Sequence, residues 1–129
     1  MSATIHQSIV LPASPDRVYA VLMSGPEFST ATGNRPAEIA SGEGGTFSVF
    51  GGAIHGRHIE LVPGKRVVQA WRVQNWEPGA YSVVRFTLSP EGSGTKVTLD
   101  HSSFPDGEDK HLDPGWHTNY WEPLTKYLG

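Results

Sequence analysis

The stretch "QAWRVQNWEPGAYSVVRF", residues 69–86, contains two tryptophans five residues apart, followed by a Pro-Gly turn. Alternation over residues 66–73 places Arg72 on the outer face of a strand and Trp71 on the inner face. Trp76 belongs to the turn, where we expect it over a rim or on the surface. The stretch therefore predicts two antiparallel strands joined by a turn, with one apolar face.

The same short alternating runs, separated by turns rich in Gly and Pro, extend over residues 36–103. In the run 95–101 the inward parity of Leu99 continues to His101, so this polar side chain should project toward the interior. For residues 53–62 either parity mixes polar and apolar side chains, and their orientation stays open. The pattern predicts a meander of antiparallel strands with one apolar and one polar face.

Helix signals precede this meander. Residues 4–12 have the alternation of a strand, and after them Ser14 and Pro15 provide an N-cap and a first-turn proline. Gly25 marks the end of that helix, and Pro26 can open a second short helix. Two short helices are therefore predicted after the first strand.

A terminal amphipathic helix is predicted after the meander. Asp113 and Pro114 form a second pair of N-cap and first-turn residues. Pro123 lies within the helix, where it removes a hydrogen bond and should kink the axis. The predicted apolar stripe consists of residues spaced three or four apart, widened by two more: Trp116, Tyr120, Trp121, Leu124, Tyr127 and Leu128.

Composition limits the class of protein. The chain has 129 residues, 18% charged residues, a net charge of −3 and no cysteine. One domain covering residues 1–129 is expected. No basic stripe is present to bind nucleic acid, and disulfides and thiolate chemistry are excluded. No apolar run is long enough for membrane insertion and the N-terminus lacks a secretion signal, so a cytoplasmic location is expected.

These elements predict an α+β fold, in which one curved antiparallel sheet of about six to seven strands covers the terminal helix. Such a sheet can leave an internal cavity next to the helix. The alternative is that the inward aromatic side chains simply fill this space. The candidate ligand-binding residues are those predicted to face it: Phe47, Gln69, Trp71, Val84, Phe86, Leu99, His101, Phe104, Trp116, Tyr120, Trp121 and Leu124.

Several motifs along nearly the whole chain resemble one family. They are Gly44-Gly45-x-Phe47, Glu60-Leu61-Val62-Pro63, Trp71-Arg72 with Trp76 after it, and Gly115-Trp116 at the helix. Together they resemble the heat shock protein 90 ATPase activator (AHSA) family of the SRPBCC/START-like superfamily, and are closest to the activator's C-terminal domain. The resemblance implies a helix-grip fold with a cavity, a chaperone-related role in the stress response, and a heat shock protein 90 type chaperone as partner.

Chemical motifs are sparse. His101 could act as an acid or base in a cavity, or could be a structural histidine bonded to a neighbouring group. The pair His55 and His58 would lie on opposite faces of an ideal strand, so we expect no metal site there, and no cofactor motif is present. Arg57, Arg72 and Arg85 either anchor an acidic ligand at a cavity mouth or decorate the outer face.

Three functions follow, in this order. The first is non-catalytic binding of a hydrophobic small molecule, lipid-like or aromatic, between the sheet and the terminal helix. The second is a chaperone-associated interaction domain, and the third is a cavity enzyme such as a cyclase or hydrolase, as some START-like domains are. No catalytic residue is assigned, because His101 lacks a second convergent polar group. A solid core filled by Trp71, Phe86 and Trp116 would count against the first.

Overall fold

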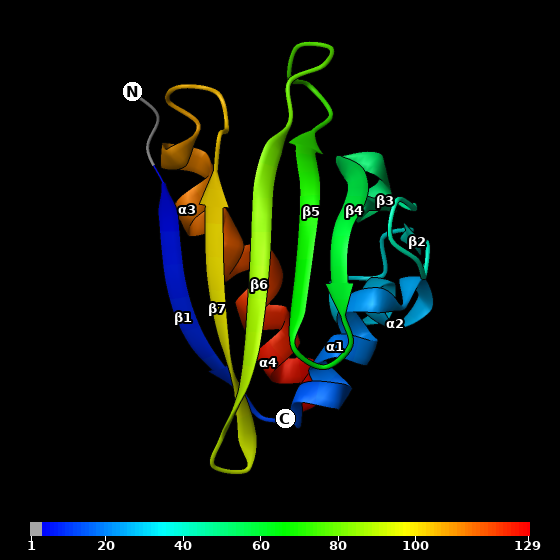
Figure 1. Ribbon diagram of the computed structural model, residues 1–129, viewed down its shortest axis with the longest axis vertical. Coiled ribbons are helices and arrows are strands. Elements are labelled where there is room, and N and C mark those ends of the chain that lie inside the picture. Colours follow the sequence, from blue (N-terminus) through cyan, green and yellow to red (C-terminus); the bar gives the residue numbers. More distant parts are fainter. Residues whose placement is uncertain (1–3) are drawn as a thin grey trace.

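Seven antiparallel strands form one sheet with helices at both ends of the chain, which confirms the predicted α+β class (Figure 1). The computed structural model describes residues 4–129; Met1–Ala3, part of the stretch considered for a secretion signal, lie outside the described residues. The strand order is β1-β7-β6-β5-β4-β3-β2. The strands are β1 (Ile5–Leu11), β2 (Glu38–Ile39), β3 (Thr46–Val49), β4 (Ile54–Val62), β5 (Arg66–Val73), β6 (Ser82–Glu91) and β7 (Gly94–Ser102).

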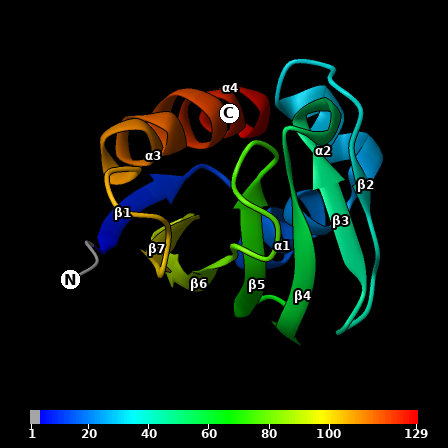
Figure 2. The same cartoon turned by 90° about the horizontal axis from the view of Figure 1, so that it is seen from above.

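The helices cover one face of this curved sheet, and the opposite face is open (Figure 2). The two short helices after β1 are α1 (Pro15–Met23) and α2 (Gly25–Ala31), as predicted. Each begins at a serine whose hydroxyl oxygen accepts a backbone N–H: Ser14 from Arg17 over 3.2 Å and Ser24 from Glu27 over 3.3 Å. These caps satisfy N–H groups that have no partner within the helix.

The terminal helix consists of three consecutive segments and begins earlier than predicted. They are α3 (Asp109–Trp116), one π-helical turn (His117–Trp121) and α4 (Glu122–Leu128). The expected start at Asp113 is wrong, because the chain is already helical from Asp109, which lets Leu112 pack into the core. Pro114 therefore lies inside the helix. No helix in residues 4–129 combines the length and apolar character needed to span a membrane.

The π-helical turn explains how two consecutive aromatic residues of the terminal helix both face the core. The N–H of Glu122 donates to the carbonyl of His117, five residues earlier. This wider turn brings residues five apart onto one side. Trp121 therefore stacks on Trp116 with ring centroids 5.8 Å apart, while Tyr120 is also buried. The turn ends two residues before Pro123, where a helical hydrogen bond is necessarily missing.

A bulge in β4 resolves the orientation that the sequence left open. The pairing with β5 shifts between His58 and Glu60, and Ile59 at the bulge is exposed. Before the bulge Gly56 and His58 face inward, and after it Leu61 packs against the core. One extra residue inverts the alternation. Neither single parity could therefore describe residues 53–62.

Arg72 alternates with the inward Trp71, and its guanidinium lies over the Tyr81 ring at 5.5 Å, but it is buried and not exposed on the outer face as expected. Its side chain is 6% exposed. Its guanidinium donates to four backbone carbonyls of the turn between β5 and β6, at distances from 2.6 to 3.3 Å. These acceptors belong to Gln74, Trp76, Glu77 and Ala80. The planar fork of arginine donors thus organises a turn whose backbone has few other partners.

Trp76 is also buried, so its predicted place at a rim or on the surface is wrong. It is 7% exposed and packs edge-on against Trp71 with ring centroids 6.0 Å apart. Its indole N–H donates to Glu108 over 2.8 Å. The turn folds back over the edge of the core because Arg72 holds its backbone, and local sequence does not reveal that contact.

Replacing Arg72 should therefore cost far more stability than replacing an exposed arginine. We expect Arg72→Ala to lower the free energy of unfolding by about 2–4 kcal/mol, because the turn loses several charge-assisted hydrogen bonds. The matched control is Arg85→Ala, which breaks only a surface ion pair with Asp100 and should cost about 0.5 kcal/mol. Urea denaturation measures both. Equal small losses would contradict the role assigned to Arg72.

Candidate functional site

A cluster of aromatic side chains fills the space between the sheet and the terminal helix. Trp71 from β5 stacks on Trp116 from α3 with ring centroids 5.5 Å apart. Phe86 from β6 meets the edge of Trp116 at 5.7 Å, and Tyr120 lies 4.3 Å from the same indole. We call these four residues and Trp121 the aromatic cluster. Its members pack at ordinary aromatic distances, so most of the space next to the helix is occupied.

All twelve candidate site residues are buried, and the structure brings them together on the inward face. Six of them border internal space: Phe47, Gln69, Trp71, Phe86, Trp116 and Tyr120. The other six lie in the surrounding core: Val84, Leu99, His101, Phe104, Trp121 and Leu124. The space bordered by Phe47, Gln69, Phe86 and Tyr120 is only about 20 Å³. That volume holds about one water molecule.

His101 lies at the centre of a buried hydrogen-bond chain. The indole Nε1–H of Trp116 donates to His101 Nδ1 over 3.1 Å. Because an indole nitrogen can only donate, Nδ1 must accept and the proton of the neutral ring lies on Nε2. That Nε2–H donates to Ser82 Oγ over 2.7 Å, and the Ser82 hydroxyl donates to the Trp71 carbonyl over 2.8 Å. We call this series the Trp116–His101 chain.

The environment of His101 favours the neutral ring. Its side chain is 0% exposed, and burial lowers the pKa of His101 to about 3. Protonation would also place a second ring N–H against the N–H of Trp116. Both ring nitrogens are already engaged, so neither is free to accept a proton from a substrate. His101 is therefore a structural residue that connects the terminal helix to three strands.

Two further contacts fix the helix to the rest of the fold. Trp121 Nε1–H donates to the side-chain oxygen of Gln7 over 2.8 Å, and the Gln7 amide donates to the side chain of Asp113 over 2.6 Å. Gln7 was not a candidate in the sequence, although its position on the inward face of β1 is what alternation gives. Burial raises the pKa of Tyr120 well above its ordinary value.

A small cavity remains beside the aromatic cluster, between the α3 end of the terminal helix and the ends of β4 and β5. Its volume is about 200 Å³. We call it the α3 cavity. Trp71, Trp116 and Tyr120 were candidates, and the other lining residues were not: Ala53, Ile54, Val73, His111, Leu112, Gly115 and Asn119. The sequence feature that could have indicated this cavity is the pair of small residues, Ala53 and Gly115, which line it together with large aromatic side chains.

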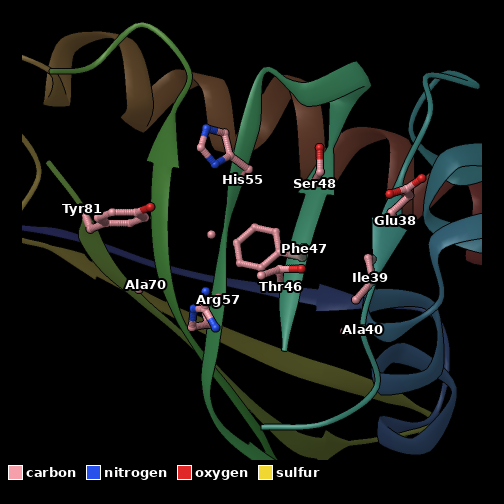
Figure 3. A pocket seen from close by; sticks show the side chains of 11 residues that line it. Glu38, Ile39, Ala40, Thr46, Phe47, Ser48, His55, Arg57, Ala70 and Tyr81 are labelled. Atoms are coloured by element: carbon pink, nitrogen blue, oxygen red, sulfur yellow. The ribbon is translucent and has the colours of Figure 1, made fainter. Parts of the chain in front are cut away.

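A second hollow lies on the outer face of the sheet. It spans β2, β3, β4 and β5 and has a volume of about 840 Å³ (Figure 3). Arg57 and His55 project from β4, Glu38 lies on one flank and Tyr81, 47% exposed, lies on the other. We call it the outer groove. Gly56 lies at its floor, and a Cβ there would lie 1.8 Å from the Ala70 carbonyl oxygen.

The two histidines of β4 do not converge. His55 borders the outer groove, whereas His58 is buried and stacks on Phe47 with ring centroids 5.5 Å apart. Burial lowers the pKa of His58, which disfavours a charge at this position. Among residues 4–129 no three His, Asp or Glu side chains are grouped so that they could hold a metal ion.

The fold and sequence place the chain in one family. The family described as "Activator of Hsp90 ATPase homolog 1-like protein" matches residues 12–129. The chain therefore belongs to this family, which confirms the resemblance read from its motifs. A human protein, Activator of 90 kDa heat shock protein ATPase homolog 1, is 27% identical over 116 residues, which is 90% of this chain and 34% of that protein. The chain thus spans about a third of the length of that curated relative.

Solved structures share the same fold over nearly the whole chain. An HSP90 activator from Plasmodium falciparum superposes with a TM-score of 0.91 and 22% identity, covering 98% of this chain and 96% of that one. The Aha1 dimer from Colwellia psychrerythraea gives a TM-score of 0.79 with 20% identity, covering 98% and 96%. These likenesses establish the helix-grip fold.

The position of His101 predicts a pH dependence of stability. Its pKa is near 6.5 in the unfolded chain and about 3 in the folded protein, so between these values the unfolded chain binds more protons. The stability that the neutral His101 ring contributes is complete above pH 6.5 and is lost as the pH falls toward 3. From pH 7 to pH 5 we expect a loss of about 2 kcal/mol.

Urea denaturation of a series of variants isolates the contribution of His101 to the pH dependence of stability. In His101→Gln the slope of unfolding free energy against pH, between pH 6 and pH 4.5, should fall by about 1.4 kcal/mol per pH unit. The matched control is His117→Gln, because His117 is exposed on the terminal helix and should leave the slope unchanged. A wild-type slope in His101→Gln would show that this ring is not the titrating group.

Proposed function

We propose that this chain is a chaperone-interaction domain that acts in the cytoplasm as one module over residues 1–129 and binds a heat shock protein 90 type chaperone. The observation that carries the proposal is family membership over residues 12–129. It is supported by a similar fold in a protein described as an HSP90 activator, of which this chain covers 96%. The filled interior favours this function over ligand binding next to the helix.

The outer groove is the surface that we propose for the chaperone. It is the open face of the sheet, and Tyr81 and Arg57 border it. Tyrosine and arginine are the residue types that most often anchor protein interfaces. Val83 beside the groove is also exposed. Arg57 donates only to the Gly44 carbonyl among the described residues, which leaves its charge free of a carboxylate partner.

Calorimetric titration of the chaperone from the same organism tests this proposal. We expect a dissociation constant in the micromolar range, as for a transient interface. Tyr81→Ala should weaken binding about tenfold. Val10→Ala, which shortens an exposed apolar side chain of β1 at the far edge of the sheet, should leave it unchanged. A chaperone ATPase assay run in parallel separates binding from stimulation.

The possible outcomes test separately whether the chaperone is the partner and whether the outer groove is its binding surface. Absence of binding at about 100 μM of each protein would end the chaperone proposal. Binding that Tyr81→Ala and Val10→Ala weaken equally would keep the partner and remove the outer groove as its site.

Binding of a small molecule is the second candidate function. The aromatic cluster occupies the space in which the sequence placed a ligand, so the proposal is confined to the α3 cavity. The observation that favours it is the cavity itself, which has a volume of about 200 Å³ and mostly apolar walls. Native mass spectrometry with a library of aromatic compounds tests this candidate, and absence of any bound compound would end it.

A further inference from the structure

The six arginines of the chain differ in how their charge is compensated. Three of them form ion pairs with a carboxylate, and two lie over an aromatic ring. Arg57 is exposed and has neither kind of partner in residues 4–129. Its Nη1 donates to the Gly44 carbonyl over 2.9 Å. The edge of this guanidinium that Nε and Nη2 form is therefore available to a partner molecule.

Arg57 projects into the outer groove next to an apolar part of the sheet surface (Figure 3). Across the sheet it pairs with Thr46 of β3 on one side and with Ala70 of β5 on the other. Ala70 pairs in turn with Val83 of β6, which is 40% exposed. Tyr81, two residues before Val83, forms the flank of the groove on that side. One row of the sheet thus places a charged side chain beside apolar side chains.

The charges around the outer groove are unevenly placed. His55 and Arg72 are cross-strand partners in β4 and β5, so a second guanidinium lies on the Arg57 side of the groove. Glu38 lies on the opposite flank, in β2, two strands away from β4. That spacing corresponds to about 10 Å, since neighbouring strands lie about 4.8 Å apart. The β4–β5 side therefore attracts anions, and the β2 flank repels them.

The two properties together define the kind of partner that fits. An ion pair on an open surface adds little affinity, because water and salt screen both charges. An apolar side chain packed beside the pair excludes water and strengthens it. In an extended segment every second side chain points to the same side, about 7 Å along the chain. A segment that alternates acidic and apolar residues can thus present a carboxylate to Arg57 and an apolar side chain to Ala70 and Tyr81.

We propose that the outer groove binds an extended acidic segment of the chaperone, and that a carboxylate of this segment pairs with the free edge of the Arg57 guanidinium. The inference rests on the proposed chaperone function and specifies the chemistry of its binding surface. Guanidinium and carboxylate form two parallel hydrogen bonds in such a pair. Glu38 determines the orientation of the segment, because it disfavours a second carboxylate at the β2 flank.

Two peptides test this chemistry without the chaperone. One is acetyl-Val-Asp-Val-Asp-Val-amide, and the other carries Asn in place of both Asp residues. Binding is followed through the ¹H–¹⁵N resonances of the full chain, including Nε–H of Arg57. We expect the acidic peptide to bind with a dissociation constant of about 1 mM or below and at least about fivefold more tightly than the neutral one. The Arg57 Nε–H signal should shift with the acidic peptide alone.

Variants separate a specific pair from the net charge of the surface. Arg57→Gln should abolish the preference for the acidic peptide and weaken chaperone binding about tenfold in calorimetric titration. Arg57→Lys should restore only part of the affinity, because lysine lacks the planar fork. The matched control is Lys96→Gln, which removes one exposed positive charge of β7 outside the groove and should change binding less than about twofold. Urea denaturation checks that all three variants are folded.

Each outcome decides one part of the inference. Absence of a preference for the acidic peptide, or of any peptide binding, would overturn the carboxylate site even if the chaperone binds. Equal weakening by Arg57→Gln and Lys96→Gln would show that only net charge matters and would overturn the role of Arg57, while chaperone binding itself stands. A preference for the acidic peptide without chaperone binding would overturn the chaperone as the source of the segment and end the proposed function.

Discussion

The structure depends on the Trp116–His101 chain, which joins the terminal helix to the sheet through a fully buried series of hydrogen bonds. Its donors and acceptors can be ordered in only one way, because Trp116 donates to His101, His101 to Ser82, and Ser82 to the Trp71 carbonyl. A buried polar network of this kind favours one arrangement, since any slip of the helix leaves polar groups unpaired. It thus determines how the aromatic cluster packs.

The filled interior also changes where function is to be sought. Helix and sheet meet through stacked and edge-on rings, which leave little room between them. Two of the hollows in residues 4–129 enter the proposals: the outer groove, on the face that no helix covers, and the α3 cavity at the edge of the aromatic cluster. The first presents an exposed tyrosine and an arginine, as a protein interface does. The second presents mostly apolar walls, as a small hydrophobic ligand requires.

Much of the fold could be predicted from local patterns, whereas the failures came from long-range contacts. Alternation correctly placed Trp71, Phe86 and His101 on the inner face, because one face of the sheet is covered. Trp76 was misplaced and the burial of Arg72 was missed, because a turn folds back on the core through hydrogen bonds that have no local signature. Simple parity failed in β4 because the bulge after His58 adds one residue and inverts the alternation. The α3 cavity depends on Gly115 and Ala53, whose small size has meaning only opposite Trp71.

The most direct test of this account is the ring ¹⁵N spectrum of His101 in the folded protein at pH 7 and at pH 5. The Trp116–His101 chain predicts one neutral tautomer at both values, with the proton on Nε2 and an unprotonated Nδ1 that accepts from the Trp116 indole. A mixture of tautomers, or protonation with a pKa near 6.5, would mean that the helix is not fixed to the sheet through this ring and would contradict the account.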